Sequence, residues 1–433
     1  TLCLLTGLSL AVIATDIRVK EGGFYYVISR TLGPAFGGAL GLTLFLSISI
    51  SVAFYVMGLV EVLNHLVTLP DWLSVRILAA AITVVLFIFA WLGADWTTKL
   101  QFLIMALVAA GLLSFFIGGI NTFSQQTLVT NWQTDASAEQ FWLAFALFFP
   151  AITGFTQGLN MSGDLRAPHR AIPKGTFAAI GLSAALYVLV ALVLAGTASI
   201  SELTDNYYIM ADVAMWAVLV AAAVMAATLS SGMASMLGAP RVLQAMGGDK
   251  LIPFLVPFAK GEGQDNNPRR AVMASTAIAL LCVIIGDLNL LAPVISMFFL
   301  AAYALLNYAT FFALHSDNPF FRPRFKWSHK IVSLIGGIGC VVAMLAINLI
   351  ACVIAIAVLF GLHQYLARSH QHRSFTDHQR GALFKRVREL LFELNSMEPH
   401  PGDWRPHMLV FSKTPERHKQ LLIFSGVLEG QSL

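Results

Sequence analysis

Long stretches of apolar residues, separated by short polar segments, dominate the pattern along the chain. These runs lie at 36–60, 77–92, 101–118, 176–196, 209–229, 271–286, 288–313, 333–349 and 350–366. Most of them have the roughly 17–25 residues that an α-helix needs to cross the hydrocarbon core of a bilayer. The pattern therefore predicts a chain that lies mostly in lipid and crosses it many times.

A further apolar run, between about Phe141 and Asn160, is interrupted near its middle. Its segment Phe148-Phe149-Pro150-Ala151-Ile152-Thr153-Gly154 combines proline and glycine, which break helices. Backbone groups freed in lipid persist where they line a cavity or find partners, and unwound carbonyls recur as cation ligands in transporters. A simple proline kink explains the same residues, so both interpretations stay open at this point.

The polar C-terminal part, from about residue 368, predicts a different environment. Residues 376–395 form an amphipathic pattern with Phe384, Val387, Leu390, Leu391 and Leu394 on one face. A strand at 407–411 and a short helix near 415–424 are expected to begin a soluble α/β domain. We therefore expect a transmembrane domain at 1–367, with about eleven helices, and a cytoplasmic segment at 368–433.

Composition agrees with the membrane interpretation and narrows the class of protein. Hydrophobic residues make up 57% of the chain and charged residues 12%, which excludes an ordinary soluble globule. The net charge of +4 is dispersed, so no nucleic-acid partner is implied. All four cysteines lie in apolar runs, and no Gly-rich phosphate loop or metal-spaced histidine cluster is visible. We expect no cofactor and no enzyme.

Loop charges set the predicted topology, because Lys and Arg stay on the cytoplasmic side of short loops. Basic residues occur in the stretches 15–35, 161–174, 239–270 and 315–332, whereas 119–138 and 198–208 have none. Threading helices between these loops puts the C-terminal segment in the cytoplasm and residue 1 outside. The run 1–14 is too short to span alone, so we expect a truncated chain whose first helix is missing.

Several motifs resemble those of the cation-chloride cotransporter family. The longest is 158–176, GLNMSGDLRAPHRAIPKGT, and others lie at 22–34, 227–231 and 298–308 in the family's order. The turn Trp404-Arg405-Pro406 is similar to the start of that family's cytoplasmic domain. The short 198–208 loop lacks the long, cysteine-bearing insertion of animal relatives, which favours a microbial member.

This resemblance implies an all-α polytopic membrane protein with the inverted-repeat (LeuT-like) fold of the amino acid, polyamine and organocation transporters. That fold has twelve membrane helices, some of them broken, and the first is absent here. The fragment 1–14 corresponds to part of the second helix. The later correspondences are 36–64 for the third helix, 139–160 for the broken sixth, 209–232 for the eighth and 288–314 for the tenth.

The resemblance also assigns cation sites. Potassium would be held by Tyr55, Pro150 and Thr153, since hydroxyl and carbonyl oxygens can replace its hydration shell. Sodium would be held by Ala227, Ser230 and Ser231, because paired hydroxyls beside a helix carbonyl suit a small hard cation. Without the resemblance, packing is the favoured explanation for both: Tyr55 as an aromatic packed in a helix bundle and the serines as helix-interface residues.

Chloride would be held by Gly154, Phe155, Thr156 and Tyr303, which offer backbone N–H groups at a helix restart and a phenol. Polar Thr156 departs from the apolar pattern of vertebrate members. Two acidic residues are gate candidates: Glu61 near the outer end of the third helix and Asp164 at an inner position. For each, an interfacial charge solvated by water is an equally good explanation.

The sequence therefore predicts a secondary active transporter in the cell membrane that moves sodium, potassium and chloride together electroneutrally. Potassium-chloride or sodium-chloride cotransport, or an amino acid permease of the same superfamily, are the alternatives, and a non-transporting partner subunit is another. The Ser230–Ser231 pair favours sodium coupling. The C-terminal segment is expected to form a homodimer.

Overall fold

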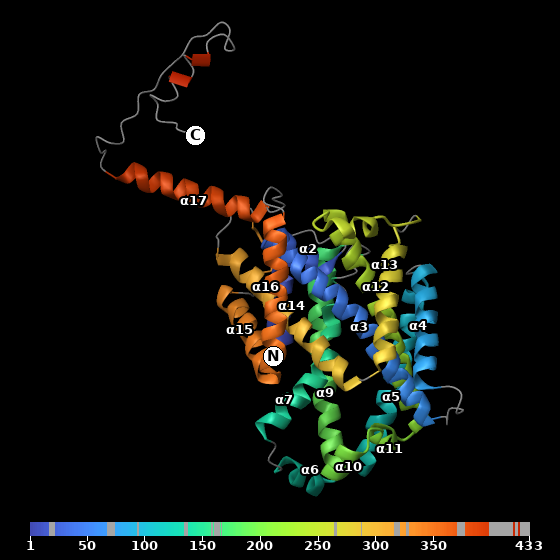
Figure 1. Cartoon of the computed structure of the whole chain (residues 1–433). Coiled ribbons are helices and arrows are strands. Elements are labelled where there is room, and N and C mark those ends of the chain that lie inside the picture. Colours follow the sequence, from blue (N-terminus) through green and yellow to red (C-terminus); the bar gives the residue numbers. More distant parts are fainter. Residues whose placement is uncertain are drawn as a thin grey trace. The chain divides into compact units, whose positions relative to one another are not determined.

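A computed structural model of the chain is helical nearly throughout. It describes residues 1–16, 22–66, 74–92, 95–133, 137–156, 159, 165, 167–263, 266–286, 288–315, 321–325, 329–369, 377–397, 419–420 and 423–424. Contacts divide the chain into Thr1–Gly381 and Ala382–Leu433. The described part contains eight helices long and apolar enough to cross a membrane, so the protein is an all-α, multi-pass membrane protein (Figure 1).

The helices of the first half begin at the N-terminus and reach the broken segment. They are α1 (Leu2–Asp16), α2 (Gly23–Thr31), α3 (Pro34–Leu66), α4 (Val75–Leu92), α5 (Asp95–Thr122), α6 (Gln125–Trp132), α7 (Ala138–Phe148) and the 3₁₀ helix η1 (Phe149–Thr156).

The second half continues from α9 to the amphipathic helix near the C-terminus. Its elements are α9 (Pro168–Thr197), α10 (Ile200–Asp205), α11 (Ile209–Val213), α12 (Ala217–Asp249), η3 (Pro253–Ala259), α13 (Arg269–Ile285), α14 (Leu288–His315), α15 (Lys330–Ile347), α16 (Leu349–Ser369) and α17 (Asp377–Ser396).

Most apolar runs are helices at the predicted positions, and α17 confirms the amphipathic helix expected at 376–395. The paired runs 333–349 and 350–366 are separated at Asn348, whose side-chain oxygen accepts a hydrogen bond from Ala351 N at 2.9 Å. The short helices α2, α6 and α10 lie in stretches treated only as loops in the sequence. The predicted strand 407–411 and most of the short helix 415–424 lie outside the described residues.

The predicted helix 209–232 is wrong at its start, because the chain leaves the helix between α11 and α12. Ser114 on α5 explains the interruption: its hydroxyl accepts from Trp216 N at 2.8 Å, and its carbonyl accepts from Met215 N at 3.0 Å. Gly118 makes this approach possible, since a Cβ there would lie 2.1 Å from the Val213 carbonyl oxygen. Backbone donors that a continuous helix would bond internally are thus satisfied by a neighbouring helix.

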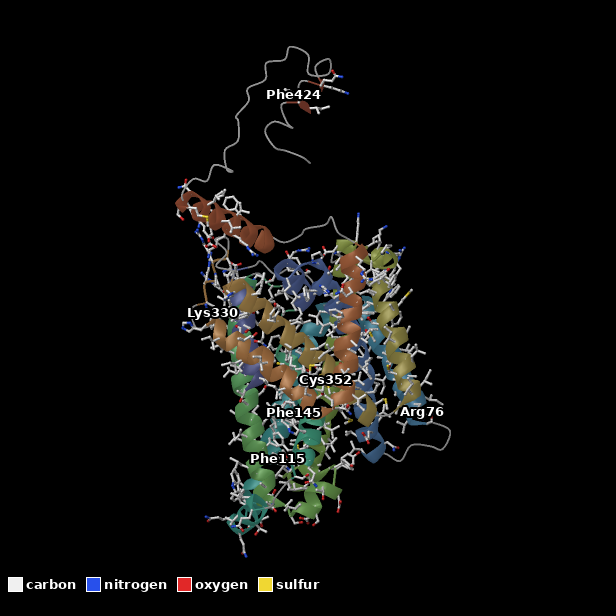
Figure 2. All side chains as sticks on the ribbon, turned by 60° about the vertical axis from the view of Figure 1, so that its left-hand side comes forward. Arg76, Phe115, Phe145, Lys330, Cys352 and Phe424 are labelled. Carbon is white, nitrogen blue, oxygen red and sulfur yellow. The ribbon has the colours of Figure 1, made fainter. Side chains whose placement is uncertain are left out.

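The core of the first unit is built around α3 and α12, which share the most extensive helix contact. Around α3 pack α2, α4, α13, α14 and α16, and α12 also packs on α5. Long apolar side chains cover the helices along their length, while charged residues such as Arg76 and Lys330 lie exposed at the first turns of α4 and α15 (Figure 2). Because α3 and α12 are packed on several sides by other helices, residues on them are held in fixed positions.

Basic stretches that the sequence assigned to one side of the membrane meet in the structure. Arg30 on α2 donates to Asp249 at the end of α12 at 2.8 Å, and Arg322 N donates to Asp16 at 2.7 Å. At the lower end of Figure 1, Asn131 on α6 donates to the carbonyls of Ala195 and Ala198, both at 2.8 Å. The grouping agrees with the predicted alternation of loops.

Asp249 joins α2 to α12 through two donors. It accepts from the Tyr25 hydroxyl at 2.5 Å and from Arg30 at 2.8 Å. Burial, together with the charge and hydrogen bond of Asp249, raises the pKa of Tyr25 well above its usual range, so the phenol stays a neutral donor. The short helix α2 is thereby fixed to the end of the central helix.

Candidate ion-binding site

The predicted break in the sixth helix is present. Ser137 caps the start of α7 by accepting from Gln140 N at 3.2 Å, and the α-helix ends at Phe148. The chain then continues as η1, a 3₁₀ helix. Pro150 explains the change, because it has no N–H to donate and its ring obstructs the preceding turn. The break lies inside the segment 148–154 that the sequence singled out.

Three of the predicted site residues on η1 are joined by hydrogen bonds from the hydroxyls of its two threonines. The Thr153 hydroxyl donates to Pro150 O at 2.7 Å, and the Thr156 hydroxyl donates to Thr153 O at 3.0 Å. Both threonines are buried, whereas Gly154 is exposed and a Cβ there would meet nothing within 4 Å. Each hydroxyl keeps its oxygen lone pairs for a further partner. The segment therefore has buried carbonyl and hydroxyl oxygens at Pro150, Thr153 and Thr156, and free space next to the Gly154 Cα.

Tyr303 on α14 completes this cluster. Its side chain is fully buried, and its hydroxyl donates to Thr153 O at 3.2 Å. Aromatic rings surround it, with centroid distances of 5.5 Å to Phe155, 5.9 Å to Phe24, 6.0 Å to Phe149 and 6.3 Å to Phe299. The structure thus brings Pro150, Thr153, Thr156 and Tyr303 together from two helices separated by about 150 residues in sequence.

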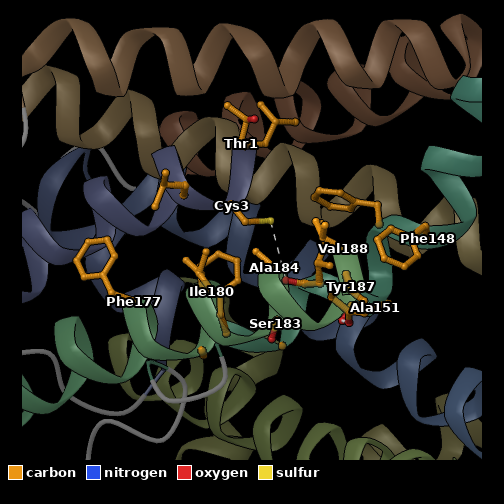
Figure 3. Close-up of a pocket in the computed structure, with 18 of the residues that line it drawn as sticks. Thr1, Cys3, Phe148, Ala151, Phe177, Ile180, Ser183, Ala184, Tyr187 and Val188 are labelled. Carbon is orange, nitrogen blue, oxygen red and sulfur yellow. Dashed lines mark hydrogen bonds between the residues drawn. The ribbon is translucent and has the colours of Figure 1, made fainter. Parts of the chain in front are cut away.

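A cavity of about 830 Å³ borders the break between α1, α9 and η1. Most of its lining is apolar, and Gly154 and Phe155 contribute to it. Cys3 on α1 and Tyr187 on α9 approach the 3₁₀ helix η1 from different sides (Figure 3). The Tyr187 hydroxyl donates to Ala151 O at 3.1 Å, and the Cys3 thiol lies 4.0 Å from Ile152 O. Side chains of α1 and α9 therefore contact backbone carbonyls of η1.

The sodium candidates lie together on α12. Ser230 is 7% exposed and donates to the side-chain oxygen of Gln101 on α5 at 2.9 Å, while Ala227 and Ser231 are half-buried. Gly232 follows them in the same helix. A Cβ at Gly232 would lie 3.6 Å from Tyr55 Cβ, so Tyr55 on α3 packs against α12 at Gly232.

Tyr55 is half-buried on α3, and its ring contacts Phe54 edge-on at 5.7 Å. Among the described residues, no hydrogen bond joins the serines of α12 to the residues of η1. The candidates on η1 and α14 therefore form one group, and those on α12 form another, with Tyr55 packed against α12 at Gly232.

Glu61, the outer gate candidate, is exposed near the end of α3. Its backbone carbonyl accepts from the Tyr208 hydroxyl at 3.2 Å, and Tyr208 belongs to the turn that precedes α11. Partial burial and then the charge of Glu61 raise the pKa of Tyr208. Asp164, the inner candidate, lies outside the described residues.

Two residues near the site were missed from the sequence. Tyr187 is a single tyrosine inside the apolar run 176–196, and Gln101 is the polar residue that opens the run 101–118. Polar side chains in membrane helices tend to face the protein interior, which is the signal that could have drawn attention to both. Nothing in the sequence pairs Gln101 with Ser230, because 129 positions separate them.

Comparison with known proteins decides the family. The family model described as amino acid permease matches residues 1–407. The chain belongs to the amino acid permease family. It is also 32% identical to solute carrier family 12 member 2 of Mus musculus and of Homo sapiens, over 96% of this chain, and 32% identical to member 1 of Mus musculus.

These relatives confirm the cation-chloride cotransporter resemblance carried by the motifs. The similarity runs almost end to end on the side of this chain, but the chain spans only 39–43% of the length of the relatives. The chain is therefore a multi-pass membrane protein of the amino acid permease family with solute carrier family 12 relatives.

Proposed function

We propose that the full-length protein is a secondary active transporter that couples sodium and potassium to chloride without net charge movement. The observation that carries the proposal is the break after Phe148, where the Thr153 carbonyl accepts from Tyr303 and Thr156 in the interior of the bundle. A broken membrane helix beside a cavity offers both carbonyl oxygens and backbone donors, which are the groups that cations and anions require.

Potassium is assigned to Tyr55, Pro150 and Thr153. The carbonyl of Pro150 and the hydroxyl of Thr153 are already adjacent, at 2.7 Å, so a cation that replaced this hydrogen bond would meet two neutral oxygens at once. Neutral oxygens suit potassium because they match its weak hydration without adding net charge. The phenol of Tyr55 would complete the site from α3.

Chloride is assigned to Gly154, Phe155, Thr156 and Tyr303. The phenol of Tyr303 is a donor, backbone N–H groups of the 3₁₀ helix η1 would be donors where its internal hydrogen bonds open, and Gly154 lies at the open side next to the cavity. An anion at this place would accept the hydrogen bond that the Tyr303 hydroxyl now donates to Thr153 O. The phenol and the carbonyl would thus separate as the anion binds.

Sodium is assigned to the carbonyl of Ala227 and the hydroxyls of Ser230 and Ser231. Ser230 is buried beside Gln101. The amide oxygen of Gln101 is a further neutral oxygen ligand of the type that hard cations prefer. This pair favours sodium coupling over potassium-chloride cotransport. Glu61, exposed at the end of α3 against Tyr208, is proposed as part of an outer gate, with Asp164 as its inner counterpart.

The multi-pass chain is proposed to lie in the cell membrane with its C-terminal segment in the cytoplasm, where α17 pairs with a second copy. The grouping of the basic stretches 15–35, 239–270 and 315–332 supports this orientation, since such residues are retained on the cytoplasmic side.

Uptake of radioactive rubidium into liposomes containing the full-length protein tests the function. We expect uptake that depends on both chloride and sodium, with no uptake of amino acids. Uptake that needs chloride but ignores sodium would support potassium-chloride cotransport instead. Amino acid uptake without any chloride dependence would favour a permease and contradict the proposal.

A further inference from the structure

A second group of polar side chains lies in the membrane interior, away from the helix break. Its members are Thr6 and Ser9 on α1, Asn307 and Thr310 on α14, and Ser333 on α15, all 0% exposed. Buried polar groups are stable when they are hydrogen-bonded, and in membranes such bonds hold helices together. The group therefore joins three helices at one point.

Asn307 is the centre of this group, and its amide is used on both sides. Its Nδ2 donates to Thr6 Oγ1 at 2.9 Å and to Tyr303 O at 2.8 Å. Its Oδ1 accepts from the Ser9 hydroxyl at 2.7 Å, and that hydroxyl lies 2.9 Å from the Ser333 hydroxyl. The amide thus links α1 and α15 to the backbone of Tyr303.

A glycine on α15 makes room for this amide. Gly336 is buried, and a Cβ there would lie 2.7 Å from Asn307 Oδ1 and 3.0 Å from Asn307 Cγ. At the adjacent Gly337, a Cβ would meet its nearest atoms, Ala304 O and Asn307 Cβ, at ordinary distances of 3.5 and 3.6 Å. The position of the amide therefore depends on Gly336 and not on Gly337.

Tyr303 has polar contacts at its backbone and at its hydroxyl. Its carbonyl lies one turn before Asn307 on α14 and accepts from the Asn307 amide, and its hydroxyl donates to the Thr153 carbonyl on η1. We propose that Asn307 is a positioning residue that sets the place of the Tyr303 phenol in the chloride site. The proposal rests on the function proposed above, in which Tyr303 is a chloride ligand.

Asn307 as a simple contact between helices is the competing explanation. In that case its loss would lower stability and the amount of active protein, and every ion would be affected alike. A positioning role has a different consequence, because in the proposed function the phenol is a ligand of chloride only, although it also contacts the Thr153 carbonyl. Its displacement would raise the chloride concentration needed for half-maximal uptake more than the sodium and rubidium concentrations.

Gly336→Ala and Gly337→Ala in the full-length protein form the decisive pair of variants. The new methyl group at 336 would press on the end of the Asn307 side chain and, at 3.1 Å, on Leu5 Cβ of α1, and the change removes no polar group from the interior. We expect Gly336→Ala to raise the half-saturating chloride concentration roughly three- to tenfold, the size of a lost hydrogen-bond restraint, and Gly337→Ala to leave it unchanged.

Asn307→Leu and Thr310→Val extend the comparison within one interface. Thr310 donates to Ser9 O at 3.3 Å and to Leu306 O at 2.9 Å, so it shares the α1 contact but not the one to Tyr303. Asn307→Leu is expected to shift the chloride requirement as Gly336→Ala does, and Thr310→Val is not. If Asn307→Leu does not fold, the glycine pair alone decides.

The measurement is rubidium uptake into liposomes with chloride, sodium and rubidium titrated in turn. Equal chloride requirements for Gly336→Ala and Gly337→Ala, in a protein whose uptake does depend on chloride, would overturn the positioning role and leave the proposed function standing. Chloride-independent uptake by the unaltered protein would overturn the proposed function, and the positioning role with it.

Discussion

Hydroxyl groups provide most of the polar contacts at the centre of the bundle. Thr153, Thr156 and Tyr303 bond to the carbonyls of the break, and Ser230 bonds to Gln101. A hydroxyl donates one hydrogen bond and accepts two, so the same group can serve a cation as ligand or an anion as donor. This versatility allows neighbouring sites of opposite charge to be built from neutral residues.

Tyr55→Phe is the most conservative substitution that tests the proposed potassium site. The change removes one oxygen and leaves a nearly isosteric ring, so packing against Phe54 persists. We expect the rubidium concentration at half-maximal uptake to rise several-fold, by roughly the contribution of one ligand oxygen, while the sodium requirement changes less. Tyr308→Phe is the control, because Tyr308 is 46% exposed on α14. An unchanged rubidium requirement in Tyr55→Phe would contradict the assignment.

Removal of both hydroxyls at Ser230 and Ser231 tests the proposed sodium site. Two oxygens leave a site of roughly five or six, and apolar neighbours cannot replace them for a small hard cation. The sodium requirement of the double alanine variant should therefore rise at least about tenfold, and either single variant should lie between it and the unaltered protein.

Ser235→Ala is the matched control for these serines, since Ser235 is also buried on α12. Rubidium uptake is measured with sodium titrated against choline. If the double variant and Ser235→Ala have the same sodium requirement, the serine pair is a packing feature of the helix interface.

Single residues show how far the sequence could be interpreted. Pro150 and Gly154 indicated either a break or a kink, because proline lacks the helix N–H donor and glycine is conformationally free. Tyr303, Thr153 and Thr156 were assigned through the family resemblance, and the structure brings these three together. The contact of Ser230 with Gln101 could not be predicted, since no sequence periodicity indicates a contact between residues 129 positions apart.

At the scale of elements, the two interrupted helices differ in what their sequences reveal. The end of α7 follows from a proline in the chain itself, whereas the gap between α11 and α12 contains the apolar residues Ala214, Met215 and Trp216. That gap depends on Ser114 and Gly118 of α5, more than 90 positions away. Tertiary contacts of this kind override a local apolar pattern, which is why the run 209–229 was predicted as one helix.

Gly118→Ala tests the tertiary origin of the gap. The added Cβ would press on the Val213 carbonyl at 2.1 Å, so α5 and the turn before α12 must separate. Overpacking of this type costs about 1–3 kcal/mol, and we expect a lower apparent melting temperature in detergent. Gly175→Ala on α9 is the control, because a Cβ there meets nothing within 4 Å. Equal melting temperatures for the two variants would show that the contact is dispensable.

At the scale of the whole molecule, the C-terminal unit and its helix α17 raise the question of assembly. Apolar side chains of α17, among them Phe384, Leu391 and Leu394, are at least 60% exposed. An apolar helix face exposed to water is unstable unless something covers it, and a second copy is the partner we propose.

Truncation of the full-length protein at two places tests the dimer. A chain that ends at about residue 370 lacks α17 and is expected to be monomeric in detergent, whereas one that ends after Met397 retains α17 and is expected to stay dimeric. Light scattering coupled to size-exclusion chromatography gives the masses. A dimer in the shorter chain, or a monomer in the longer one, would show that other parts of the protein make the interface.

The fold as a whole was largely predictable, because lipid forces long apolar helices and hydropathy records them. The short helices α2, α6 and α10 were not, since they are too short for an apolar period and depend on contacts such as that of Asp249 with Arg30. The inverted repeat and the domain boundary at 367 stay predictions.

The lengths of α3 and α12 have a consequence for the surrounding lipid. Each helix has 33 residues, or about 50 Å at 1.5 Å per residue, against a hydrocarbon layer about 30 Å thick. Tilting alone would require an angle beyond the roughly 40° seen for membrane helices. Even at that tilt, part of each helix extends past the hydrocarbon, so its terminal turns lie at the level of the polar headgroups.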